Sequence, residues 1–201
     1  MKAPRSIAQL VASLGMLVFA GSALAQWELD NEHSSLNFIS IKNDAVAESH
    51  RFDSLVGFIG AEGAVRLAID LGSVDTLIEI RDERMRELLF ETAKFPSANV
   101  TGDVDPAILQ ALEPGSVVTT DIELRLSLHG QESTVSAPVV VINESTDDLR
   151  VISSRPVLLN AADFGLVGGI AALQKVAGLA SIDTVVPVTF HLVFKPVAPA
   201  S

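Results

Sequence analysis

The chain has 201 residues, of which 25 are acidic and 14 basic, giving a formal net charge of −11, and it contains no cysteine. This balance excludes a protein that binds by attraction to phosphate backbones or anionic lipid surfaces, and disulfides contribute nothing to the fold. The length suits one domain with a sizeable core.

The N-terminal segment has the pattern of a signal peptide. Lys2 and Arg5 precede a mostly apolar run, Ile7–Ala20, and Ala23–Ala25 is a small-x-small cleavage site. The apolar run is too short to be a good membrane span. We therefore expect residues 1–25 to be removed, with an uncleaved amphipathic helix as the alternative. No cysteine follows the apolar run, so a lipoprotein anchor is excluded. Cleavage removes two basic residues and changes the net charge from −11 to −13.

Strand patterns dominate residues 26–201, which we expect to form a single domain. Apolar and polar residues alternate most clearly at 65–71, 121–129 and 186–194. A period of two places one set of side chains on each face, so one face is buried, as in an antiparallel sheet. Weaker strands are predicted at residues 35–41, 46–58, 77–81, 99–104, 133–142 and 149–159. About eight antiparallel strands in one small domain indicate a sandwich or a barrel.

One short helix is predicted at Glu83–Glu91. Asp82 precedes it and can cap its N-terminus by accepting a hydrogen bond from a free backbone N–H. Met85, Leu88 and Leu89 form an apolar stripe on one face. The helix is expected to pack against one end of the sheet, an arrangement compatible with a ligand beneath it.

Turns and a second helical segment follow. A tight hairpin turn is predicted at residues 129–131, where Gly130 is free to take a positive φ. Residues 113–116 and 145–148 are further turn signals. Gly168–Ala180 is rich in glycine and small residues, so any helix there is marginal by itself, and it is open whether this segment is a flap or a connecting loop.

A series of motifs resembles the YceI-like family of periplasmic polyisoprenoid-binding proteins, and the resemblance covers most of the chain after the signal peptide. The matching fragments are Trp27-Glu28-Leu29-Asp30 with His33-Ser34, Phe38, Ile41-Lys42, Ile80-Arg81-Asp82, Met85-Arg86, Phe90, Phe95-Pro96, Leu126-Ser127-Leu128-His129-Gly130 and a late strand motif, Asp163-Phe164-Gly165. Each fragment is weak alone, but their order and spacing are specific. The chain departs from the family at Ser127, where threonine is usual, and in the longer segment at Gly168–Ala180.

The resemblance implies an all-β fold: an extended, eight-stranded, antiparallel, lipocalin-like β-barrel with the two helical segments described above. It also implies a periplasmic location and a lumen that holds a long isoprenoid chain, such as a polyprenyl alcohol, an isoprenoid quinone or a quinone precursor. A homodimer is implied as well, although the composition is equally consistent with a monomer. No cofactor apart from the bound lipid, no nucleic-acid partner and no membrane-embedded segment are expected.

The candidate ligand contacts are mostly apolar residues on the faces expected to point inward. They are Leu36, Phe38, Phe52, Phe58, Leu67, Ile69, Ile78, Ile80, Arg81, Met85, Leu88, Phe90, Leu124, Leu126, Leu128, Phe164 and Phe190. Burial of a hydrocarbon chain gains about 0.8 kcal/mol per CH₂, so a long tail needs no special headgroup site. For any single phenylalanine, filling the core is the simpler role, and Arg81 with Asp82 is better explained as an ion pair and a cap that fix the corner between strand and helix.

The sequence shows no catalytic or metal-binding pattern. His33, His50, His129 and His191 lack the spacing of a metal site, and no nucleophile elbow, P-loop or dinucleotide fingerprint is present. His129 and His191 fall on polar strand faces and are expected to be solvated. A binding protein, not an enzyme, is therefore predicted. Two alternatives remain: an enzyme acting on a lipid or quinone inside the barrel, which would need polar groups in the lumen, and an integral outer-membrane barrel, which the scarcity of tryptophan and the absence of tyrosine disfavour.

Overall fold

The computed structural model describes residues 25–197, except 111 and 145–147. The predicted signal peptide thus lies almost wholly outside the described residues, as does most of the predicted turn at 145–148. The strands are β1 (Ala25–Leu29), β2 (Ser35–Lys42), β3 (Val46–Phe52), β4 (Leu55–Gly60), β5 (Ala64–Asp70), β6 (Val74–Asp75), β7 (Ser97–Asp103), β8 (Val117–Leu128), β9 (Gln131–Asn143), β10 (Leu149–Ser153), β11 (Val157–Asn160) and β12 (Val185–Pro196). The helices are α1 (Glu79–Arg84), α2 (Pro106–Gln110), α3 (Val167–Ala177), the 3₁₀ turns η1 (Asn31–His33), η2 (Leu71–Ser73) and η4 (Ala161–Phe164), and a π-helix, η3 (Met85–Leu89).

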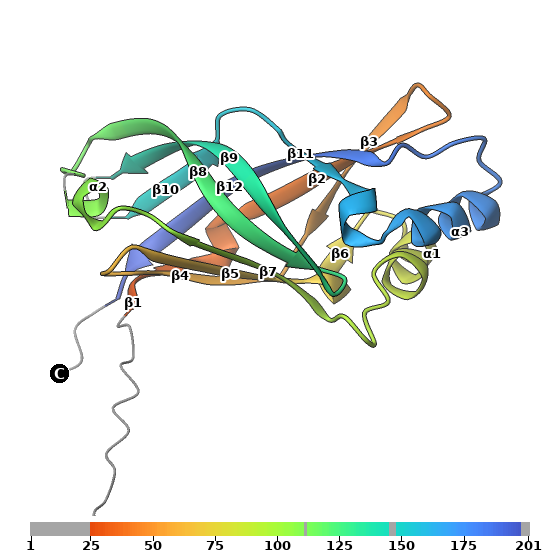
Figure 1. Cartoon of the computed structure of the whole chain (residues 1–201), viewed down its shortest axis with the longest axis horizontal. Helices are drawn as coiled ribbons and strands as arrows, with labels where there is room; N and C mark the ends of the chain where they lie inside the picture. The colour runs from red at the N-terminus through yellow and green to blue at the C-terminus, as the bar shows by residue number, and fades with distance from the viewer. Residues whose placement is uncertain (1–24, 111, 145–147, 198–201) are drawn as a thin grey trace, which may run out of the picture.

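The sheet closes into the predicted eight-stranded antiparallel barrel. Its order is β1-β4-β5-β7-β8-β9-β10-β12, and the pairing of β12 with β1 completes the circle. Strand β12 is long enough to serve two partners, because its C-terminal part pairs with β1 and its middle with β2. Strands β2, β3 and β6 thereby extend the wall beyond the end of β1. Figure 1 shows α2 at one end of this elongated barrel and α1 with α3 at the other.

Alternation of side chains places the core inside the barrel. On β5, Leu67 and Ile69 are buried, whereas Arg66 and Asp70 are exposed. Register between neighbouring strands keeps like faces together, as where Leu67 pairs with Val100 of β7, and Val100 with Leu126 of β8. The hydrophobic period therefore fixes which residues face the lumen.

The β8–β9 hairpin turns where the sequence predicts. Leu128 pairs with Gln131, and the two residues between them, His129 and Gly130, have φ values of 52° and 74°. Positive φ at both central positions gives the twist that suits a two-residue hairpin. The turn at 113–116 is also present, since the Ser116 N–H donates to the Glu113 carbonyl (2.9 Å).

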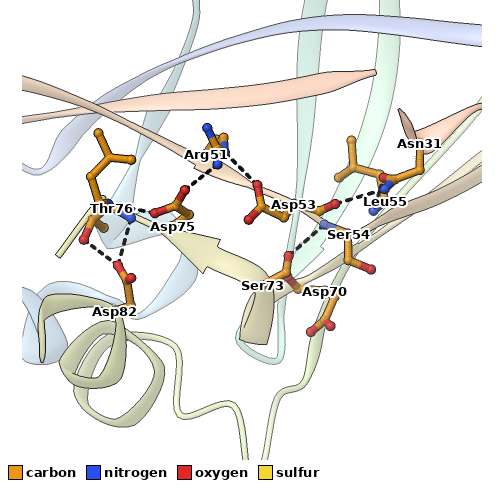
Figure 2. Close-up of polar contacts among 11 residues, drawn as sticks. Asn31, Arg51, Asp53, Ser54, Leu55, Asp70, Ser73, Asp75, Thr76 and Asp82 are labelled. Carbon is orange, nitrogen blue, oxygen red and sulfur yellow. Dashed lines mark hydrogen bonds and ion pairs between the residues drawn. The ribbon is translucent and has the colours of Figure 1, made fainter. Parts of the chain in front are cut away.

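The strand predicted at 46–58 is wrong in extent, because two strands, β3 and β4, occupy it. Between them the ladder is replaced by side-chain hydrogen bonds, which Figure 2 shows as a polar corner. The Ser54 N–H donates to Ser73 Oγ (3.0 Å), and the Leu55 N–H donates to Asn31 Oδ1 (2.7 Å). These local acceptors let the chain leave β2 and join β1 without unpaired backbone groups.

The strand predicted at 149–159 is likewise two strands, β10 and β11. They are separated by residues 154–156, and Pro156 cannot donate to a ladder. Strand β10 pairs with β12 at Phe194 to His191, whereas β11 pairs with β12 at Val188 to Val185. The chain thus returns to the same partner strand further along its length.

The strand predicted at 77–81 is wrong. Only Val74–Asp75 is extended, and α1 begins at Glu79 after the N-cap Ile78, which makes no side-chain cap. Asp82 is therefore not the N-cap that we predicted. Its carboxylate instead accepts hydrogen bonds from the backbone N–H (2.8 Å) and the hydroxyl of Thr76, tying β6 to α1 (Figure 2). The alternation at 77–81 misleads because Leu77, Ile78 and Ile80 are all exposed.

The second helical segment is a helix, α3, which ends at Gly178 in the left-handed conformation (φ 65°). Gly169 lies in its first turn against η3, since a Cβ there would be 2.6 Å from the Leu88 carbonyl oxygen and 2.8 Å from Leu89 Cα. The close approach of the two helices thus requires a glycine. Ile170, the next residue, is buried at this contact.

Candidate ligand cavity

The lumen contains a cavity of about 270 Å³. Its wall extends from Val104, Ile108 and Leu112 at the α2 end to Leu89, Leu166 and Ile170 at the α1–α3 end. Among the described residues that line it, Thr120 is the one with a polar side chain. Such a space offers a ligand dispersion contacts and removal from water but almost no hydrogen bonds.

The structure brings most of the predicted contact residues together on this wall. Those that line the cavity are Leu36, Phe38, Phe52, Leu67, Ile69, Phe90, Leu124, Leu126, Leu128, Phe164 and Phe190. Phe164 does so from η4, not from a strand, and Gly165 follows it with a φ of 67°. The role of these residues in binding stays a prediction, but their position is the one that such a role requires.

Six predicted residues lie outside the cavity wall: Phe58, Ile78, Ile80, Arg81, Met85 and Leu88. Ile78 and Ile80 are 48% and 52% exposed, because they belong to the start of α1 and not to a strand. Met85 is buried, but on a side of η3 that packs within the core without reaching the cavity. The missed period change at residue 78 explains the selection of Ile78 and Ile80, whereas Phe58 lies next to Ile59, the residue of β4 that lines the cavity.

Other wall residues were missed by sequence reasoning. They include Val135, Val139 and Val141 of β9, Val151 of β10, and Val188 of β12. All lie on predicted strands. Counting every second residue from Phe190 gives Val188, and the register of the predicted hairpin carries the inward face from Leu126 to Val135, Val139 and Val141. Val151 additionally requires the register of β10 with its neighbours.

The inner face of the β2–β3 arm changes from apolar to polar beyond Phe38. His50 is paired across the strands with Phe38, and their ring centroids are 5.1 Å apart. His50 is 4% exposed, and its Nε2 is hydrogen-bonded with Ser40 Oγ (2.8 Å). Burial, and then the charge of Arg81, lowers the pKa of His50 below its ordinary value. The neutral imidazole is therefore favoured at this end of the arm.

Arg81 fixes the corner between β6 and α1. Its guanidinium donates to Glu48 Oε2 (2.9 Å) and to the Thr76 carbonyl (2.5 Å). Lys42 also contacts Glu48 (2.7 Å), and hydrogen bonds from Lys42 and then Arg81 lower the pKa of this carboxyl against the opposing effect of burial. The ion pair anticipated for Arg81 is present, with its partner 33 residues away. A headgroup contact by Arg81 stays a prediction.

The two histidines expected to be solvated are in fact half-buried and partnered. The His129 ring packs against the Phe95 ring at a tilt of 53°, with centroids 4.5 Å apart, and its Nε2 lies 3.4 Å from Glu91 Oε2. His191 Nε2 accepts a hydrogen bond from Arg150 (2.8 Å), and burial together with the Arg150 charge lowers the pKa of His191. The partners of His129 come from the segment between η3 and β7, and that of His191 from β10, and the alternation alone identifies neither.

The described residues contain neither a metal-binding cluster nor a membrane-spanning helix. Within 25–197 and outside its gaps, no group of three or more histidine, aspartate or glutamate side chains is placed to hold a metal ion. In the same part of the chain, no helix combines the length and apolarity needed to cross a membrane.

Together, the fold and cavity define a closed antiparallel β-barrel with an apolar lumen. The model of the YceI-like domain matches residues 27–194, and the chain belongs to this family.

Solved structures agree with this assignment. A polyisoprenoid binding domain from Saccharophagus degradans, described as implicated in plant cell wall breakdown, is 40% identical with a TM-score of 0.83, and the match covers 86% of this chain and 99% of that one. Burkholderia cenocepacia BcnA, at 17% identity and a TM-score of 0.64, shares the fold over 82% of this chain and 98% of its own. Comparison with curated proteins yields no significant match.

Proposed function

We propose that this protein is a periplasmic binding protein that carries a long-chain isoprenoid lipid, either a polyprenyl alcohol or an isoprenoid quinone or its precursor, in the barrel lumen. The observation that carries the proposal is the cavity, which runs between the helical ends of the barrel and is lined almost entirely by aliphatic and phenylalanine side chains. A long unbranched or methyl-branched hydrocarbon has the shape and chemistry of this space.

Energetics support a chain of this kind. Each buried CH₂ contributes about 0.8 kcal/mol, so a chain of several isoprene units offsets the cost of association without polar contacts. The 40%-identical domain from Saccharophagus degradans, described as polyisoprenoid-binding, supports the same ligand class. The described residues that line the lumen include one polar side chain, Thr120, whereas an enzyme acting on the same ligand would need a cluster of polar groups, so binding without chemistry is the function proposed.

The decisive experiment is mass spectrometry of lipid extracted from protein purified out of its native host. We expect one prenyl lipid per protein molecule. An unrelated periplasmic protein, purified and extracted in the same way, is the control and should yield no such lipid. Recovery of only phospholipid in the amounts found on the control would contradict the proposal.

Export is tested separately. We expect the mature protein to begin at Gln26 and to appear in the periplasmic fraction, because Ala23–Ala25 forms the cleavage site. Intact-mass measurement of the fractionated protein checks both points. A full-length chain in the cytoplasm would contradict export, and a chain in the outer-membrane fraction would favour the integral barrel.

A further inference from the structure

The barrel wall is interrupted between β9 and β11. One edge of β9 pairs with β8 from Gln131 to Ile142, whereas the opposite edge pairs with β10 only from Val139 to Asn143. Strand β11 pairs with β12, and no ladder joins β9 to β11 among the residues that the structure describes. In Figure 1, β10 and β11 lie toward different ends of β12, so the N-terminal half of β9 faces β11 without a strand between them. The hydrogen bond from the Ser154 N–H to the Pro138 carbonyl (2.9 Å) marks the end of this gap.

A second cavity of about 180 Å³ occupies the gap. Its wall carries hydroxyl, amide and carboxyl groups from Ser133, Thr134, Ser136, Asn160 and Asp163. Unlike the lumen, it therefore offers hydrogen-bond donors and acceptors, to which the unpaired edges of two strands add backbone groups.

The two cavities share wall residues. Val135, Val157, Leu159 and Phe164 line both the lumen and the gap. An apolar tube and a polar recess thus lie on two sides of the same side chains. A lipid that passes between these side chains would have its tail in the lumen and its polar group in the gap.

The charge of the gap selects among headgroups. Asp163 is its one charged residue among those described, and no lysine or arginine lines it. A phosphate or pyrophosphate entering it would lose hydration without gaining a cation, and would meet a carboxylate. An uncharged hydroxyl or carbonyl would hydrogen-bond without this cost.

We infer that the gap between β9 and β11 holds the uncharged, oxygen-bearing headgroup of the lipid whose tail lies in the lumen, and that it discriminates against phosphorylated forms of the same chain. The inference rests on the proposed function and adds the position and chemistry of the headgroup.

The test compares a prenyl alcohol with its monophosphate of equal chain length, at low ionic strength, by titration of the delipidated protein. We expect the alcohol to bind at least tenfold more tightly. Asp163→Asn is expected to narrow this ratio about fivefold, because one negative charge is removed next to the headgroup. Asp103→Asn, on the exposed part of β7, makes the same change in net charge and is expected to leave the ratio unchanged.

A photoreactive, uncharged headgroup on the same chain locates the site independently. Crosslinks are expected within residues 133–136 or 160–163. Crosslinks at 108–112 or 166–170, equal affinity for alcohol and phosphate, or identical effects of the two aspartate variants would each overturn the inference while leaving the carrier intact. Failure of both ligands to bind would overturn the carrier and this inference together.

Discussion

At the scale of residues, the most informative polar groups join segments that are distant in the chain. Asp30 caps η1 by accepting a hydrogen bond from the Glu32 N–H (3.1 Å), and it also contacts His33 (2.8 Å) and Lys195 (2.5 Å). The hydrogen bond from Lys195, with a smaller contribution from His33, lowers the pKa of Asp30 from 3.8 to about 2, although burial acts in the opposite direction. The start and the end of the barrel are thereby joined by one carboxylate.

Asp30→Asn is therefore expected to destabilise the protein near neutral pH. The asparagine side-chain oxygen can still accept the capping hydrogen bond, but the variant lacks the negative charge that attracts Lys195. Because the folded-state pKa is below the unfolded one, the contribution of the carboxylate is complete above about pH 4 and is lost as the pH falls from 3.8 towards 2. Urea unfolding from pH 2 to 7 checks this, and a stability difference that does not shrink in acid would contradict it.

His50→Gln tests the buried imidazole. The lowered pKa of His50 means that the unfolded chain binds this proton first, so wild-type stability falls as the pH drops below 6.5. The variant lacks this titration, and its stability is expected to depend less on pH in that range. Unfolding curves between pH 4.5 and 7.5 provide the comparison, and parallel pH profiles would show that His50 is protonated in the folded protein as readily as in the unfolded chain.

At the scale of elements, α3 and η3 close one end of the barrel as a pair. The small residues that make α3 marginal alone also let it approach the neighbouring backbone, as Gly169 does at η3. Leu89 of η3 and Ile170 of α3 then line the lumen from this end. The pair therefore forms one boundary of the cavity.

Adjacent glycines provide a matched test of this contact. Gly169→Ala would place a methyl group against backbone atoms at 2.6 and 2.8 Å, and we expect a loss of about 1–3 kcal/mol in the free energy of unfolding. Gly168→Ala meets nothing within 4 Å and should stabilise the helix by up to about 1 kcal/mol. Thermal unfolding of both variants measures the difference. Equal effects would show that the close approach is unimportant.

At the scale of the whole molecule, stability and binding draw on the same inward faces. Leu149, Val139 and Phe194 are 1–2% exposed and Val151 is partly buried, yet all four line the lumen. One set of inward side chains thus supplies both the packed core and the wall of the cavity.

Filling the lumen is expected to weaken lipid binding without unfolding the protein. Val151→Phe would occupy space for two or three CH₂ groups, costing about 2 kcal/mol of binding free energy, or roughly thirtyfold in affinity. Ile152→Phe, next to it on β10 but outside the cavity wall, is the control and should bind as the wild type does. Titration with a long prenyl alcohol gives both affinities, and equal affinities would place the ligand elsewhere.

The sequence by itself determined the class of fold and the inward faces of its clearest strands. Period-two alternation on β5, β8 and β12 is a local property, and once one face of a strand is buried the identity of the inward residues follows. The hairpin at His129–Gly130 was equally readable, because its backbone conformation is set by the residues of the turn.

Tertiary structure alone decided what depends on partners far along the chain. The breaks at Ser54 and Pro156, the start of α1 at Glu79, and the pairing of Arg81 with Glu48 are set by contacts with Asn31, Ser73, β12 and β3. The gap beside β9 is also set by distant partners, because it arises where β12 pairs with β10 along one part of its length and with β11 along another. The alternation in a strand predicts which face is buried, because burial depends on side chains. It does not predict which neighbouring strand pairs with each edge, because that pairing uses backbone groups that all residues share.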